Sequence, residues 1–150
     1  MKKNIVNLKR FYLFAVVVIA GCSSEPQPEP IHVGEDLCAA CRMAIIEPQF
    51  AAEIVQPSGE VLKYDDLACL AKGVANLPNT SQRQVFVQDY FTREWMRHEQ
   101  VVVVRESRLQ TPMGSGAVAL ASHEAAEKFI AENGGQPMSL QVFLQQSTSK

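Results

Sequence analysis

Apolar and polar residues alternate over several short stretches of this chain, and this pattern predicts β-strands. Residues 50–56 (FAAEIVQ) and 60–64 (EVLKY) flank the turn Pro57-Ser58-Gly59, which predicts a hairpin. The later stretches are rich in β-branched residues, QVVVVR above all. They predict four more strands, at 84–89, 100–105, 117–121 and 138–144.

Polar capping residues stand ahead of two other apolar stretches and predict helices there. Asp65 and Asp66 precede a helix over 67–74, and their charge suits the positive end of the helix dipole. Ser122 precedes a second helix over 123–132. The remaining segments are predicted to be connections, at 76–81, 90–98 and 109–116.

The order of these elements predicts an α+β fold. Antiparallel strand hairpins are each followed by a helix, so the helices are expected on one face of the sheets. The order strand, strand, helix occurs twice along the chain. We therefore predict two small similar ββα-type units, although the two share little sequence.

The first residues have the layout of a secretory signal. Four of the first ten residues are basic, and the apolar run 11–20 is too short to span a bilayer as a mature helix. It ends in Ile19-Ala20-Gly21-Cys22, which resembles a lipobox, where the peptidase cuts before the cysteine and its thiol carries the lipid. We expect residues 1–21 to be a lipoprotein signal peptide and Cys22 the lipidation site. An ordinary signal peptide with a chance cysteine is the alternative.

A polar segment rich in proline follows the lipobox and predicts a tether at 22–35, since such a segment stays extended and builds no core. The domain is then expected at 36–145, with a polar tail at 146–150. Ser23 resembles the residue found after the cysteine in lipoproteins sent to the outer membrane. We expect a periplasm-facing protein anchored by its lipid, at the outer membrane rather than the inner.

Charge and motifs limit the function. The whole chain has 14 basic and 16 acidic residues, and without the basic residues of the leader the excess of acidic charge rises to about six. A nucleic-acid partner is therefore not expected, because it requires a basic patch. The sequence has no Ser-His-Asp arrangement, phosphate-binding glycine loop or His-Glu-x-x-His motif, so we expect a binding protein rather than an enzyme.

The segment Cys38-Ala39-Ala40-Cys41-Arg42-Met43 places two thiols and a thioether within six positions. Thiolates and thioethers are soft donors, which select Cu(I) over harder ions. A methionine sulfur carries no proton, forms no disulfide and releases an ion readily, so a mixed set of donors suits a carrier. Met113 is a further candidate because Pro112 and Gly114 predict a tight loop around it, where core packing explains a methionine less well.

Other roles stay open for Cys38 and Cys41. They could form a redox pair, as Cys-x-x-Cys does in thioredoxin-like proteins. They could bind structural zinc together with Cys69 and a histidine such as His32. They could also form a disulfide that staples the loop, although three mature cysteines are an odd number in an oxidising compartment. For Cys69, on the apolar side of its predicted helix, a buried core thiol is as good an explanation as a ligand.

Several segments between Cys38 and about Gln136 follow one another in a specific order. They are Cys41-Arg42-Met43, Tyr64-Asp65-Asp66-Leu67-Ala68-Cys69, Val87-Gln88-Asp89-Tyr90 with Trp95, Thr111-Pro112-Met113-Gly114-Ser115-Gly116, and Gly134-Gly135 after a helix. Together with the lipobox, this set resembles the NosL-type copper-binding lipoproteins, the accessory proteins of nitrous oxide reductase.

The resemblance implies an α+β fold of two small similar units and Cu(I) binding through Cys and Met donors. It implies delivery of copper to the copper centres of nitrous oxide reductase, alongside a membrane transporter. By position it points to Cys41, Met43 and Met113 as ligands, with Cys69 as a weaker candidate. Cys38 is additional to the plainer Cys-x-Met pattern of the family. Because of this difference, the client could be another copper protein.

The resulting prediction is a lipid-anchored Cu(I) metallochaperone. Cys38 and Cys41 would bind the ion as thiolates, with Met43 and Met113 as exchangeable thioethers. The alternative is an envelope thiol–disulfide redox protein that uses Cys38 and Cys41.

Overall fold

A computed structural model describes residues 25–78 and 82–147 of the chain. The predicted signal peptide, the lipidation site Cys22 and the first residues of the tether lie outside the described residues. The strands are β1 (Ala52–Val55), β2 (Val61–Tyr64), β3 (Gln84–Gln88), β4 (Trp95–Arg97), β5 (Val102–Arg105), β6 (Val118–Leu120) and β7 (Gln136–Ser139). The helices are α1 (Leu67–Asn76), α2 (His123–Asn133) and α3 (Leu140–Ser147), with short 3-10 turns η1 (Pro48–Phe50) and η2 (His98–Gln100).

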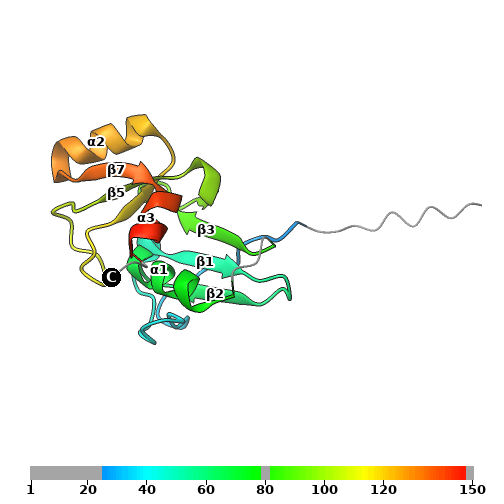
Figure 1. The fold of residues 1–150 in the computed structure, drawn as a ribbon. Coiled ribbons are helices and arrows are strands. Elements are labelled where there is room, and N and C mark those ends of the chain that lie inside the picture. The colour runs from blue at the N-terminus through cyan, green and yellow to red at the C-terminus, as the bar shows by residue number, and fades with distance from the viewer. Residues whose placement is uncertain (1–24, 79–81, 148–150) are drawn as a thin grey trace, which may run out of the picture.

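The strands form two antiparallel sheets (Figure 1). One has the order β2-β1-β3-β4 and the other the order β6-β5-β7. In each, a hairpin leads into a helix, and the next strand returns to pair with the free side of the first strand. The predicted α+β fold of two similar units is therefore confirmed. The first ββα unit is extended by two strands, β3 and β4, and the second by one, β7.

Both predicted helices are present and begin at the predicted residues. The Asp66 carboxylate accepts a hydrogen bond from the Ala68 N–H at 2.7 Å, and Ser122 accepts one from the Ala125 N–H at 3.1 Å. These are the N-cap bonds that start α1 and α2. Among the described residues, no helix combines the length and apolar character needed to cross a membrane.

The core consists of two clusters of buried side chains. The larger cluster joins both sheets and includes the fully buried Cys38 and Cys69. The smaller cluster surrounds Phe129 beneath α2. Helix α3 lies between the two units, against α1, β5 and β7 (Figure 1). Two of the candidate metal ligands are therefore built into the packing that joins the two halves.

The strand predicted at 138–144 is present only at its first two residues, and the prediction is wrong from Leu140 onward. The chain leaves β7 at Ser139 and continues as α3, which also includes the first two residues of the predicted polar tail. Leu140 and Phe143 are buried, whereas Val142 is exposed. A separation of three residues places side chains on one face of a helix, and here it outweighs the equally visible alternation of apolar residues.

The prediction that 90–98 is only a connection is also wrong, since it contains β4. The Asp89 carboxylate accepts hydrogen bonds from the N–H groups of Phe91 and Thr92, which close the turn ahead of this strand. Arg93 has a φ of 62°. A turn built by an aspartate and a left-handed arginine lacks the glycine or proline that ordinarily marks one. The strand predicted at 100–105 begins later, at Val102, because η2 precedes it.

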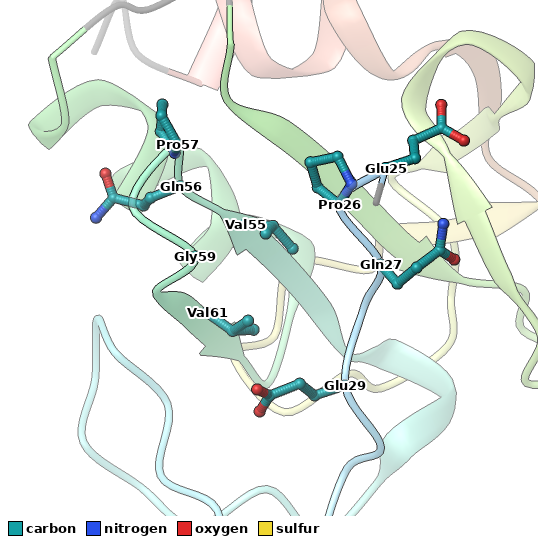
Figure 2. Close-up of a pocket in the computed structure, with 9 residues that line it drawn as sticks. All are labelled: Glu25, Pro26, Gln27, Glu29, Val55, Gln56, Pro57, Gly59 and Val61. Carbon is teal, nitrogen blue, oxygen red and sulfur yellow. The ribbon is translucent and has the colours of Figure 1, made fainter. Parts of the chain in front are cut away.

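The described part of the tether lies against the first sheet. The Glu29 N–H donates to Glu53 Oε2 at 2.9 Å, and Lys63 Nζ donates to the Pro30 carbonyl at 3.0 Å. Figure 2 shows the segment from Glu25 to Glu29 running past Val55 and Val61. Glu53 is buried on β1, and this burial raises its pKa to about 7. From Glu25 onward this segment lies against the domain, and residues 33–35 form a turn.

The helical assignment of the C-terminal residues can be tested with adjacent substitutions. Phe143→Ala should lower the free energy of unfolding by about 3–5 kcal/mol, because it removes a buried ring. Val142→Ala, the matched control on the exposed side of α3, should change it by less than about 0.5 kcal/mol. Urea unfolding of the reduced protein measures both. A strand over 138–144 would reverse the two results.

Candidate metal centre

The thiols Cys38 and Cys41 lie on a narrow hairpin loop. The Cys38 N–H donates to the Met43 carbonyl at 2.8 Å, and the Arg42 N–H donates to the Cys38 carbonyl at 2.9 Å. Arg42 has a φ of 67°, which reverses the chain between the two cysteines and Met43. Cys38 is consequently fully buried, while Cys41 lies at the edge of the core.

The loop is fastened to the first sheet at β2. The Ala39 N–H donates to the Lys63 carbonyl at 2.7 Å, and Lys63 Nζ donates to Asp36 Oδ2 at 2.8 Å. One residue of β2 thus binds the loop through both its backbone and its side chain. This attachment places the two thiols over the chain that leaves β2 and enters α1.

The start of α1 supplies two more donor atoms. Asp65 directly precedes the N-cap Asp66, and Cys69 lies in the first turn of α1. Asp65 Oδ2 accepts a hydrogen bond from Cys41 Sγ at 3.3 Å. The donor atoms of Cys38, Cys41, Asp65 and Cys69 all lie within 4.8 Å of one another. Segments distant in the sequence therefore converge on one small volume.

This geometry suits a single metal ion. Sulfur atoms bound to one ion at about 2.3 Å can be no more than about 4.6 Å apart, so the donors need only a small adjustment. Three sulfurs favour a soft ion such as Cu(I), and the carboxylate adds a harder donor. All three thiols are free rather than disulfide-bonded. No histidine of the described residues joins the cluster; the His32 ring instead lies 3.5 Å from the Asp36 carboxylate.

Burial favours the protonated thiols of Cys41 and Cys69 in the metal-free protein. It raises the pKa of Cys69, and the neighbouring Asp65 and Cys38 raise that pKa further. Burial also raises the pKa of Cys41, against a smaller opposing effect of a hydrogen bond from the Met43 backbone. Asp65 Oδ1 is buried with no hydrogen-bond partner among the described residues. A cation would compensate this oxygen and displace the thiol protons, since thiolates rather than thiols bind metals.

The neighbouring carboxylate of Asp66 binds the loop that contains Met113 through hydrogen bonds. Beyond capping α1, Asp66 accepts hydrogen bonds from the Met113 N–H at 3.1 Å and the Ser115 hydroxyl at 2.9 Å. The half-buried Met113 side chain packs against the core cluster that contains Cys38 and Cys69. The loop of Met113 therefore lies against the first turn of α1, next to Asp65, the residue that faces the thiols.

The structure brings together the predicted residues Cys38, Cys41 and Cys69, the last of these predicted as the weaker candidate. Met43 is in the same loop and about half exposed, and ligation by Met43 and Met113 stays a prediction. Asp65 was missed as a site residue because the cap explanation was applied to both aspartates. Its spacing of four residues from Cys69 was the available signal, although Asp65 lies outside the helix, ahead of the N-cap.

Comparisons with known proteins give a family match and a structural match. The sequence model of the NosL family matches residues 30–145, which include the whole cluster. Among solved structures, the crystal structure of the copper chaperone NosL from Shewanella denitrificans is similar, with a TM-score of 0.69 and 20% sequence identity. The similarity covers 77% of this chain and 94% of that chain, and it supports the fold. The comparison with curated proteins found no match.

The role of Asp66 can be tested by its removal. Asp66→Ala should lower the free energy of unfolding by about 3 kcal/mol or more, because it leaves a cap and two tertiary hydrogen bonds unmade. Ser122→Ala, which removes only the cap of α2, should cost about 1 kcal/mol. Urea unfolding of the reduced, metal-free protein measures both. Equal losses would mean that Asp66 is a cap and nothing more.

Proposed function

The chain belongs to the NosL family, and from this premise we propose that it carries Cu(I) as a chaperone of the bacterial envelope. The observation that carries the proposal is the convergence of three free thiols and a buried carboxylate within 4.8 Å in a member of this family. The similar solved protein is described as a copper chaperone. The proposed activity is binding and release of an ion rather than catalysis.

The different burial of the three thiols supports a carrier function. Cys38 and Cys69 are fully buried and would retain the ion, whereas Cys41 lies at the edge of the core. Met43, which is about half exposed, and Met113, which is half-buried, would add thioethers. These exchange readily because they bind without a proton to displace. An ion held between buried thiols and a surface donor is protected from water yet open to a partner on one side.

For the client we propose the copper centres of nitrous oxide reductase or of a similar copper enzyme, supplied together with a membrane transporter. The anchor proposed is a lipid on Cys22 that holds the domain at the periplasmic face of the membrane, the outer membrane rather than the inner. The lipobox and the Ser at position 23 support this location.

The alternative of a redox protein has less support. Reactive cysteines of Cys-x-x-Cys motifs have a lowered pKa, because the thiolate is the nucleophile. Here burial and the adjacent Asp65 raise the pKa of Cys41. The two functions also differ in their need for methionine, which a redox pair does not use.

The deciding experiment is a Cu(I) titration of the reduced chain from Ser23 onward, under anaerobic conditions and in competition with a colorimetric chelator. Tight binding of one ion per chain is expected. If the fully reduced protein leaves all the copper on the chelator, the chaperone function is excluded and the loop is a redox or stapling element.

Substitution of the sulfur donors should separate their roles. Met43→Leu combined with Met113→Leu should weaken Cu(I) binding at least about tenfold, the scale on which even outer-shell changes act. Met96→Leu combined with Met138→Leu is the matched control, since these methionines pack against the same core but lie on β4 and β7 rather than in the loops of Met43 and Met113. Cys38→Ser combined with Cys41→Ser should abolish tight binding.

The same set tests the alternative function. A redox protein would keep its reduction potential after the Met43 and Met113 changes. Wild-type Cu(I) affinity in the Cys38 and Cys41 double variant would contradict the site assignment. A change in stability alone would indicate a structural disulfide.

The pH dependence of binding follows from the thiol pKa values. Because the pKa values of Cys41 and Cys69 are raised, both bind protons at neutral pH, and Cu(I) must displace them. The affinity should rise with pH by about tenfold per unit for each proton released, and fall correspondingly on acidification. Chelator competition at pH 6, 7 and 8 measures the slope. An affinity independent of pH would mean that thioethers, not thiols, hold the ion.

A further inference from the structure

Exposed large hydrophobic side chains concentrate beside the metal centre. Of six such side chains among the described residues, four lie between positions 33 and 46. We call these four the apolar ridge: Val33 (54% exposed), Leu37 (54%), Met43 (47%) and Ile46 (66%). Apolar groups clustered on a surface are typical of interaction sites, whereas scattered ones are not.

Two of these residues, Leu37 and Ile46, lie on the outer face of the hairpin that holds the thiols. Leu37 pairs with Ala44 across the hairpin, and the Ile45 N–H donates to the Asp36 carbonyl at 2.9 Å. Successive side chains of an extended strand point to opposite faces. Cys38 and Ile45 are therefore fully buried, while their neighbours Leu37 and Ile46 face outward.

The charges beside the ridge are mainly acidic. Glu35 is exposed and Glu47 is half-buried, and Arg42 is the basic residue of the hairpin loop. Lys63, on the adjoining β2, is bound to Asp36 at 2.8 Å and is already neutralised. An acidic rim is repelled by anionic lipid headgroups. A second copy would place the same acidic residues against one another across a two-fold axis.

We infer that the apolar ridge is the docking surface for the copper-receiving client, a protein face with an apolar centre and a basic rim. This inference rests on the proposed function and names where its transfer step occurs. Docking here would bring the client's sulfur donors to Cys41 and Met43 at the edge of the site. As each bond from copper to a cysteine sulfur breaks, a bond to a client sulfur forms. The ion remains Cu(I), client thiols give up protons, and the vacated thiolates take protons up.

The test compares two transfer rates from the Cu(I)-loaded, lipidated full chain in a neutral detergent. One acceptor is apo nitrous oxide reductase, and the other is bathocuproine disulfonate, which needs no docking surface. Leu37→Ser combined with Ile46→Ser should slow transfer to the apoenzyme at least about tenfold, the scale of losing central apolar contacts. Transfer to the chelator, and the Cu(I) affinity, should not change. Val142→Ser, an exposed apolar residue on α3, is the control.

The acidic rim gives a second, independent variant. Glu35→Lys combined with Glu47→Lys should also slow transfer to the apoenzyme, and added salt should slow the wild type, because complementary charge mainly raises the association rate. Both variants change exposed or half-buried positions, so we expect both to fold. An unchanged thermal unfolding temperature verifies this.

Three results would overturn the inference. Wild-type transfer rates in the Leu37 and Ile46 variant would exclude the ridge as the docking surface. A copper-loaded dimer that this variant dissociates, seen by light scattering, would assign the ridge to a second copy. Tight Cu(I) binding without transfer from the wild type to the apoenzyme would exclude that client, yet leave the carrier function standing. Absence of Cu(I) binding is a separate result that excludes the proposed function itself.

Discussion

The metal centre depends on two adjacent buried carboxylates at the start of α1. Asp66 has an extended backbone, with φ −157° and ψ 152°, so its side chain and that of Asp65 point to opposite sides of the chain. Asp66 holds the helix start and the loop of Met113, and Asp65 faces the three thiols. The helix cap thus fixes the orientation of a metal-site residue and brings a remote loop beside it.

The metal-free centre is preorganised and incompletely satisfied. Its thiols are buried in the cluster that joins the two sheets, so their positions follow from core packing rather than from loop geometry alone. Asp65 Oδ1 remains without a partner among the described residues, and an unpaired buried carboxylate oxygen is costly. Binding a cation offsets that cost, whereas proton displacement opposes binding. The balance of these two effects suits an ion that must be both retained and released.

Features set by local chemistry could be predicted from the sequence, and features set by packing could not. The helix starts followed from Asp66 and Ser122, which act within one turn of the chain. The strand predicted at 138–144 failed because its apolar residues fit both periodicities, and burial of Phe143 decided for a helix. The contact of Asp65 with Cys41 joins two separate segments, so the sequence offered only the spacing from Cys69 as a signal.

One hairpin serves two purposes because its strands have two faces. The inner face places Cys38 in the core, and the outer face places Leu37 and Ile46 toward solvent. The alternation of side chains along the hairpin therefore assigns Cys38 to metal retention and its neighbour Leu37 to partner contact. Substitutions on the outer face leave the core packing of the thiols in place. Recognition of a client could thus diverge at Leu37 and Ile46 while the affinity for the ion stays constant, since these two side chains face away from the thiols.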